Sequence, residues 1–510
     1  MKSKRVLLSV AVLVIAGLLV LSGCDTNGDD DDDGATALNF DQDFSIIEFD
    51  ADGDGELESA SNEDLNEAVD DGGGKISTYD PDGDGTPDKV DGKFVRVLAG
   101  RFEEDVVLTS DTIWYLDGSV FIGVNGDADS PIAVADKTEL EIKKGTEVRG
   151  LVSSQNPGAL VIDRGGKINA VGTKSEPVVF TSAAAEGSRE PGDWGGLIIN
   201  GFARVQGGTA DGEGSTGEYG GGSSPVNDDS SGTLKYARVA FGGTLFSTDN
   251  ELNGIAFQGV GSGTDVEYVQ VHRNADDGVE FFGGSVQVKH IVLSGIQDDS
   301  LDHDDGWNGS AQYIMIQQWD DGDNGIEGDG DATPSGGTIG PVNAVLANFT
   351  IVSGDGNDYP FFFRRSAEPD VYNSLVYNTP LNFDDDSVRA SINEDTGVED
   401  GTDQAPGTID FKGVAIDATA QNSDFSAGSN GNAKASDLLG TATWPSSPVY
   451  DAGAENFGFV AQPTSVDVGT AQSVPATDPA GNSLDDTDFI GAVDPAGTDW
   501  TTGWTAFPEN

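Results

Sequence analysis

The chain has 510 residues and is rich in the residues of turns and strands, with 71 Gly, 89 Asp or Glu and only 26 Lys or Arg. Its formal net charge of -63 repels phosphate backbones and anionic lipid headgroups, which argues against nucleic-acid binding and against polybasic docking to membranes. Divalent cations and a high-salt habitat, where self-repulsion is screened, both account for such acidity.

The N-terminus has the pattern of an export signal. Three basic residues within the first five positions precede an apolar run over 6–21, and small residues lead to Cys24, the single cysteine. We therefore predict a signal peptide over 1–23. The letters LSGC that end at Cys24 resemble the lipobox of bacterial lipoproteins, and this resemblance implies that Cys24 is acylated. An uncleaved transmembrane anchor is the alternative, for which the apolar run is short.

The next segment, 24–45, is predicted as a disordered acidic tether, because it combines a run of Asp with few apolar residues. An acidic run directly after a lipidated cysteine is similar to the surface-export signal of Bacteroidota lipoproteins. In a proteobacterium, Asp25 implies retention in the inner membrane instead. The expectation is an outer-membrane lipoprotein exposed at the cell surface and attached to the membrane through its N-terminal lipid.

Residues 46–94 contain two D-x-D-x-D-G loops and are predicted as a small calcium-loop module. In such loops alternate carboxylates surround one ion and a Gly makes the sharp turn, which suits Ca²⁺. The second loop resembles those of thrombospondin type 3 repeats and dockerin-like modules. Solvated loops without an ion are the alternative, and NEDLNEAV between the loops is predicted as a short helix. The candidate ligands are Asp50, Asp52, Asp54, Asp80, Asp82, Asp84 and Asp88.

From residue 95 to 510 short β-branched runs recur between turns, without sustained helical periodicity. NGIAF, DGVEF, DSLDH and NGIEG superpose with Asn253, Asp277, Asp299 and Asn324 equivalent, at steps of 24, 22 and 25 residues. Strands upstream keep the step, since Val269 aligns with Ile291, Ile314 and, after an insertion, Phe349. Earlier alignments pair Ile142 with Ile162 and Val148 with Ile168, both 20 residues apart.

Strands and turns at this period imply a solenoid in which each rung stacks on its neighbours to bury a shared core. A leucine-rich repeat is excluded, because the repeats lack a Leu/Asn consensus and a helix. The predicted fold is therefore all-β, a right-handed parallel β-helix with a small N-terminal calcium-loop module. We predict a loop excursion at 207–232 and a less regular part at 391–510.

The chain from about residue 95 onward resembles the pectin-lyase-like β-helix lipoproteins and secreted proteins of Bacteroidota and marine proteobacteria. The segments that carry the resemblance include INAVGTKSEPVVFTS, GDWGGLIING, LKYARVAFGG, ADDGVEFFGG and the terminal DFIGAVDPAGTDWTTGWTAF. The resemblance implies the fold and a surface location, and it leaves the activity open.

Stacked rungs bring acidic side chains together around DDSLDHDDGW at 298–307. Rungs about 4.8 Å apart place Asp277 over Asp299, and a second column of carboxylates follows three residues later. Carboxylates so close require a bound cation or raised pKa values. We predict a cation-binding ladder of Asp277, Glu280, Asp299, Asp302 and Glu327. For Asn253 and Asn324, which end the first column, a hydrogen-bonded Asn ladder is the alternative.

Three functions are consistent with the sequence. The first is a calcium-stabilised surface module that binds or scaffolds polysaccharides or an outer-membrane protein. The second is a polysaccharide lyase or glycoside hydrolase, although the chain has no G-H-G and no R-x-K motif, and Arg364–Arg365 is the candidate for a lyase base. The third is a structural surface-layer component. His272, His290 and His303 do not show ligand spacing, so no catalytic residue is predicted.

Overall fold

The computed structural model describes the residues of one compact unit, Phe44–Asn510. The described ranges are 47–49, 58–60, 65–69, 73–79, 89–90, 92–153, 156–247, 250–319, 321–330, 344–352, 359–364, 367–377, 389–390, 409–416, 432–434 and 471–508. Cys24 and the seven Asp of the two calcium loops lie outside them, so the predictions made for these residues stay predictions. No helix in the described ranges is long and apolar enough to cross a membrane.

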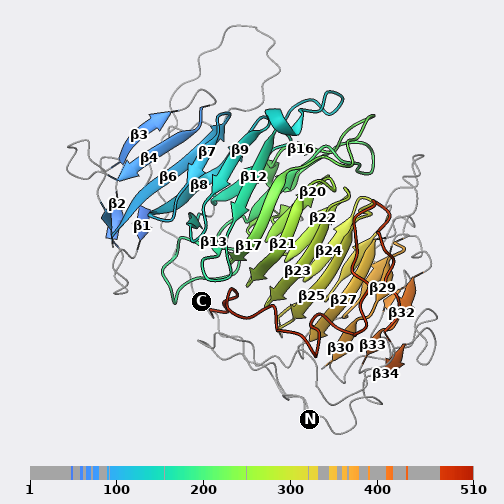
Figure 1. The fold of residues 1–510 in the computed structure, drawn as a ribbon. Helices are drawn as coiled ribbons and strands as arrows, with labels where there is room; N and C mark the ends of the chain where they lie inside the picture. The colour runs from blue at the N-terminus through green and yellow to red at the C-terminus, as the bar shows by residue number, and fades with distance from the viewer. Residues whose placement is uncertain are drawn as a thin grey trace, which may run out of the picture. The chain divides into compact units, whose positions relative to one another are not determined.

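The unit is a right-handed parallel β-helix, as predicted, and its strands follow one another along the solenoid in chain order (Figure 1). Each rung contributes to three sheets. The first face consists of the end of β8 (Thr112–Ile122), β11 (Ala159–Ile162), β14 (Leu197–Asn200), β20 (Ile255–Gln258), β22 (Val279–Phe282), β24 (Leu301–Asp304), β26 (Glu327–Asp329), β28 (Phe362–Arg364) and β31 (Arg389–Ala390).

The second and third faces share long strands that bend from one face to the other. These are β17 (Gly232–Ala240), β21 (Asp265–His272), β23 (Gln287–Ser294), β25 (Ser310–Gln317) and β27 (Val345–Val352). Shorter strands extend the second face, namely β7 (Val106–Leu108), β9 (Thr138–Ile142), β12 (Gly166–Val171), β29 (Asp370–Tyr372) and β32 (Asp410–Lys412). The third face is extended by β10 (Glu147–Gly150), β13 (Val178–Ser182), β30 (Leu375–Tyr377), β33 (Ala415–Ile416) and β34 (Ala433–Lys434).

The bend between the second and third faces lies at one residue per rung, and these residues form a corner column. Its members have left-handed backbone with φ between 46° and 64°, and they are Tyr236, Tyr268, His290, Tyr313, Asn348 and Asn373. Such a φ costs a non-Gly residue roughly 1–2 kcal/mol. The first four rings stack on one another, at centroid distances of 4.6, 4.4 and 4.7 Å, and this packing offsets the cost.

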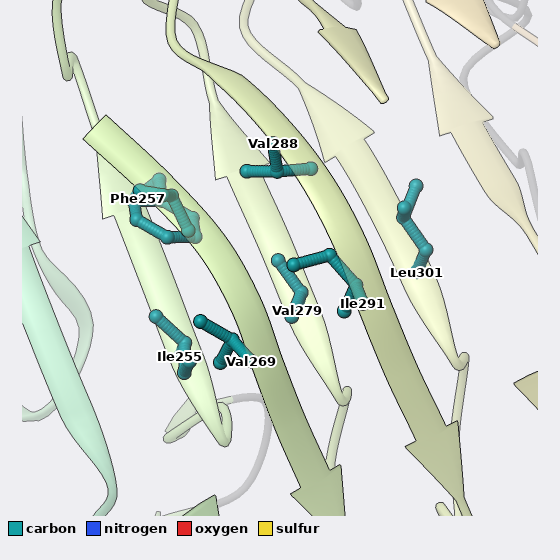
Figure 2. Close-up of a pocket in the computed structure, with 8 residues that line it drawn as sticks. Ile255, Phe257, Val269, Val279, Val288, Ile291 and Leu301 are labelled. Atoms are coloured by element: carbon teal, nitrogen blue, oxygen red, sulfur yellow. The ribbon is translucent and has the colours of Figure 1, made fainter. Parts of the chain in front are cut away.

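The interior of the helix is filled by apolar side chains that alternate with outward-facing ones along each strand. Figure 2 shows side chains from β20, β22 and β24 meeting those from β21 and β23, among them Phe257 and Ile291. They surround a void of about 10 Å³, which is about the size of one water molecule. The core at this level of the solenoid therefore offers no space for a substrate.

Antiparallel strands cover the N-terminal end of the solenoid. β3 (Leu65–Val69), β4 (Lys75–Tyr79) and β6 (Lys93–Phe102) pair in that order, and β6 then pairs in parallel with β8. β1 (Ile47–Phe49) with β2 (Glu58–Ala60), and β5 (Lys89–Val90) with β6, are antiparallel pairs as well. The helix predicted for NEDLNEAV was wrong: the chain there forms β3, because pairing with β4 outweighs local propensity.

The register of the rungs agrees with the sequence alignment from β20 onward and differs before it. Val269, Ile291, Ile314 and Phe349 are paired partners in successive rungs, as predicted. The upstream alignments were wrong, because Ile142 pairs with Leu108 and Ala170, and Val148 pairs with Trp114 and Phe180. The residues that appeared equivalent, such as Ile142 and Ile162, lie on different faces of the helix.

Two segments without long strands pack on the outside of the rungs. The predicted excursion contains β15 (Ala210–Asp211), η3 (Glu213–Ser215) and β16 (Glu218–Tyr219), and the Tyr219 hydroxyl donates to Asp305 Oδ2 at 2.9 Å. Residues 471–508, the C-terminal strap, run back across β27, β25, β23 and β21 (Figure 1). Side-chain amides of Gln270, Gln312 and Asn373 each bond both the N–H and the C=O of one strap residue.

Candidate metal centre

Tightly stacked turns bring the carboxylates together where each rung enters the first face. Asn253, Asp277 and Asp299 occupy equivalent positions in these turns; Gly254 follows Asn253 and Gly278 follows Asp277, whereas Ser300 follows Asp299. A Cβ on Gly254 would stand 2.7 Å from the carbonyl oxygen of Gly278, and one on Gly278 would stand 2.5 Å from that of Ser300. The turns can approach this closely only because these positions have no side chain.

The predicted ladder has the predicted register. β22 and β24 pair Glu280 with Asp302, and Leu301 bridges to Ile326, so that Glu327 follows Asp302 in the same column. Between the turns, the backbone N–H of Asp299 donates to Asp277 Oδ1 at 3.0 Å, and that of Asn324 donates to Asp299 Oδ1 at 2.7 Å. Each carboxylate in the turns is thus held by the backbone of the next rung.

The side chains come close enough to share cations. Three sets of carboxylates each place one oxygen per residue within 4.8 Å of the others. They are the inner set Asp277, Glu280 and Asp302, the middle set Asp277, Asp298 and Asp299, and the outer set Glu251, Asp276 and Asp298. This separation equals about twice a Ca²⁺–oxygen bond. Glu327 lies outside the sets, hydrogen-bonded with Asp299.

Sequence reasoning missed the outer set. Asp276 and Asp298 directly precede the predicted ladder residues Asp277 and Asp299. The alignment that pairs Asp277 with Asp299 therefore also pairs Asp276 with Asp298, and the sequence could have indicated this second pair. Glu251 comes from β19 (Asn250–Glu251), which forms a hairpin with β18 (Leu245–Ser247), and no repeat links it to the two turns. A contact of that kind depends on how the hairpin folds over the rung.

Burial and mutual repulsion disfavour the ionised forms of these groups. Desolvation raises the pKa values of Asp277, Glu280, Asp299 and Asp302 well above their usual range, and neighbouring carboxylates raise them further. Desolvation, with Asp298 nearby, raises the pKa of Asp276 to about 8. Among the described residues none of the first four carboxylates forms an ion pair with a lysine or arginine. Protons or metal cations must therefore balance their charge.

The donor atoms point to a hard cation. All members of the three sets offer carboxylate oxygens, and oxygen shells of this kind suit Ca²⁺. His303 is directed into the core beside Trp307 and Phe363, where burial lowers its pKa to about 4. His272 lies under the C-terminal strap and His290 lies in the corner column. None of the three histidines belongs to the carboxylate sets.

A second candidate site is a groove of about 360 Å³ on the second face. It is lined by Ser110, Glu141, Ile142, Lys143, Lys144, Asn169, Val171 and Glu176. Lys143 pairs with Glu141 and Lys144 pairs with Glu176, and both lysine side chains are about half exposed. The groove combines hydroxyl, amide, ammonium and carboxylate groups with an exposed apolar patch at Val171.

In comparison with protein families, residues 100–450 match a family described as pectate-lyase like beta helix domain. Comparison with the curated proteins and with the solved structures finds no match. The matched region contains the metal centre and the groove. The C-terminal strap lies beyond it.

Proposed function

Because the chain belongs to the pectate-lyase-like β-helix family, we propose that it is a calcium-stabilised module of the outer-membrane surface that binds polysaccharide. A solenoid presents a long, regular outer surface, which suits a chain-like ligand. An outer-membrane protein bound along the same surface is the alternative ligand. The proposal includes the two predicted calcium loops as further calcium sites. In the chain they lie between β1 and β2 and between β4 and β5.

The observation that carries the proposal is the repetition of the carboxylates from rung to rung. A catalytic pair is needed once, whereas a ladder that recurs in β22, β24 and β26 stabilises each of the rungs it joins. In the described residues no imidazole or lysine lies beside the inner set, so the carboxylates are the only groups there that could take up a proton. The arrangement fits a structural cation.

The groove is the best-supported place for the sugar. Its volume lies in the usual range of ligand sites, and its mixed donors and acceptors match the hydroxyls and carboxylates of a polysaccharide. Elsewhere the charge of -63 repels an acidic glycan, so the lysines at 143 and 144 provide a local exception.

Replacement of both groove residues Lys143→Ala and Asn169→Ala is expected to weaken oligosaccharide binding by at least about tenfold, the equivalent of about 1.4 kcal/mol or one to two hydrogen bonds. Binding is measured by calorimetry with the best ligand from a glycan array that includes uronic-acid oligomers. Lys412→Ala is the matched control, because Lys412 is also ion-paired but lies on β32, far along the chain from the groove. Unchanged affinity in the double variant contradicts the groove assignment.

A lyase is the second candidate, and one observation favours it. The register of β26 and β28 places Arg364 beside Asp329 on the first face, in the column that also contains Asp304. An arginine in register with a column of carboxylates is an arrangement that a Ca²⁺-dependent lyase would need, although Asp304 and Asp329 belong to none of the three sets. The same oligosaccharides are therefore assayed for unsaturated products. Turnover that disappears in Arg364→Ala would replace the binding function by a lyase, and neither binding nor turnover would favour a surface-layer role.

The surface location is tested through the lipid anchor. Cys24→Ser removes the thiol that the lipobox presents for acylation, so the variant is expected to leave the membrane fraction and appear in the soluble fraction. Protease added to whole cells is expected to digest the anchored wild-type protein. Membrane retention of the variant equal to that of wild type refutes the anchor, and protection from protease refutes surface exposure.

A further inference from the structure

The three carboxylate sets of the metal centre overlap. Asp298 belongs to the outer and the middle set, and Asp277 belongs to the middle and the inner set. The cluster is therefore one continuous row of seven carboxylates contributed by three successive rungs. A single cation in the inner set leaves the charges of the outer set unbalanced, although the oxygens of that set lie within 4.8 Å of one another. Each such pair repels by about 1 kcal/mol in water and by several kcal/mol where solvent is limited.

Asn253 gives an independent indication of a ligand. Its side chain is 1% exposed, and its Nδ2 donates to Glu280 of the inner set. Its Oδ1 is buried and has no hydrogen-bond partner among the described residues. A buried carbonyl oxygen without a donor costs about 1–3 kcal/mol. Because the neighbouring acidic groups supply no donor when ionised, a cation is the natural partner for this oxygen.

We propose that this corner binds two calcium ions, one at the inner set with Asn253 Oδ1 and one at the outer set, joined through Asp277, Asp298 and Asp299. The proposal rests on the calcium-stabilised corner described under the proposed function and adds a second ion to it. The row carries seven negative charges when ionised, and two Ca²⁺ ions balance four of them. The middle set connects the two sites, because it shares Asp277 with the inner set and Asp298 with the outer set.

The outer ion also ties the excursion to the rungs. η3 packs against β19, which contributes Glu251 to the outer set. Glu213, the first residue of η3, acts electrostatically on Asp276 and on Glu280, so its carboxylate faces the row. An ion at the outer set attracts Glu213 and holds the excursion over β20. An ion at the inner set acts on Glu213 through Glu280 but has no link to β19, because Glu251 and Asp276 do not belong to that set.

The test counts calcium ions on the full chain. Wild type, the outer variant Glu251→Gln/Asp276→Asn and the inner variant Glu280→Gln/Asp302→Asn are freed of metal with chelator and titrated with ⁴⁵Ca²⁺ in equilibrium dialysis. Each variant is expected to bind one ion fewer than wild type. Ions bound by the N-terminal loops do not affect this difference, because all three proteins contain the loops. Hydrogen exchange at 209–222 in calcium is expected to rise further above the wild-type level in the outer variant than in the inner variant, because only the outer set includes Glu251 of β19.

The amide replacements preserve shape and remove charge, and circular dichroism confirms that each variant is folded. An outer variant that binds as many ions as wild type overturns the second ion and leaves the inner one in place. If the inner variant also binds the wild-type number, the calcium-stabilised corner of the proposed function fails as well. Binding of Mg²⁺ with equal affinity at the outer set would overturn the assignment to calcium.

Discussion

Deletion of residues 471–510 is expected to remove most of the stability of the solenoid. The C-terminal strap covers outward-facing apolar side chains that the rungs alone leave exposed. Near the corner column, Trp504 and Phe507 pack on Val292 and Met315. A second apolar cluster, on the second face, consists of Val345, Ala347, Tyr372, Val474 and Leu484. Burying one large apolar side chain contributes about 1.5–3 kcal/mol, so the whole strap contributes a sizeable part of a typical stability of about 5–15 kcal/mol.

A single substitution tests the same contact without removing the chain. Trp504 is 2% exposed, and Trp504→Ala is expected to lower the free energy of unfolding by about 3–5 kcal/mol. Val152→Ala is the control, because Val152 is 52% exposed and its truncation is expected to change stability by no more than about 0.5 kcal/mol. Urea unfolding followed by tryptophan fluorescence and by circular dichroism gives both values. Equal unfolding midpoints for Trp504→Ala and wild type would show that the strap only rests on the surface.

The stability of the metal-free protein is expected to fall as the pH rises, and calcium is expected to reverse this trend. In the folded state the pKa of Asp276 is raised from 3.8 to about 8, and that of Glu213 from 4.5 to about 7, in both cases chiefly by desolvation. A raised carboxyl pKa means that the folded state binds more protons than the unfolded state over this window. The resulting stabilisation is complete below the unfolded pKa and is lost as the pH rises through the folded one.

Calcium requires the ionised carboxylates, so its binding strengthens as protons leave. At a concentration 100 times the dissociation constant, each site adds about 2.7 kcal/mol to the free energy of unfolding. Thermal unfolding between about pH 5 and about pH 8 is measured in chelator and in calcium. The two melting-temperature curves are expected to diverge as the pH rises. A metal-free protein that becomes more stable toward pH 8 would contradict the assignment.

The variant Asp299→Asn/Asp302→Asn separates the effect of carboxylate repulsion on stability from the effect of calcium binding. It removes two repelling charges, so in chelator at pH 8 it is expected to be at least as stable as wild type. In calcium the order is expected to invert, because wild type gains the free energy of calcium binding and the variant loses one carboxylate of the inner set and one of the middle set. The same order in both conditions would indicate that the ladder is neutralised by protons alone.

The repeat made the carboxylate cluster predictable from the sequence. A parallel β-helix converts a period along the chain into adjacency in space, so equivalent residues of successive repeats become neighbours about 4.8 Å apart. Alignment of Asp277 with Asp299, and of Glu280 with Asp302, was therefore sufficient to place them in the same columns, and the structure has them there. The inward positions of Val279 and Leu301 follow from the same register.

The tertiary structure decided the contacts made by residues that do not belong to the repeat. The upstream alignment of Ile142 with Ile162 was wrong. Rungs of unequal length can be aligned in several registers, each of which preserves the alternation of inward-facing and outward-facing residues. Glu251 reaches Asp276 only through a hairpin, and Trp504 reaches Val292 only because the strap turns back along the rungs. The sequence by itself determined which residues repeat and hence which carboxylates stack. Folding of the non-repeating segments onto the solenoid decided what covers those rungs, since side-chain packing between distant segments leaves no period in the chain.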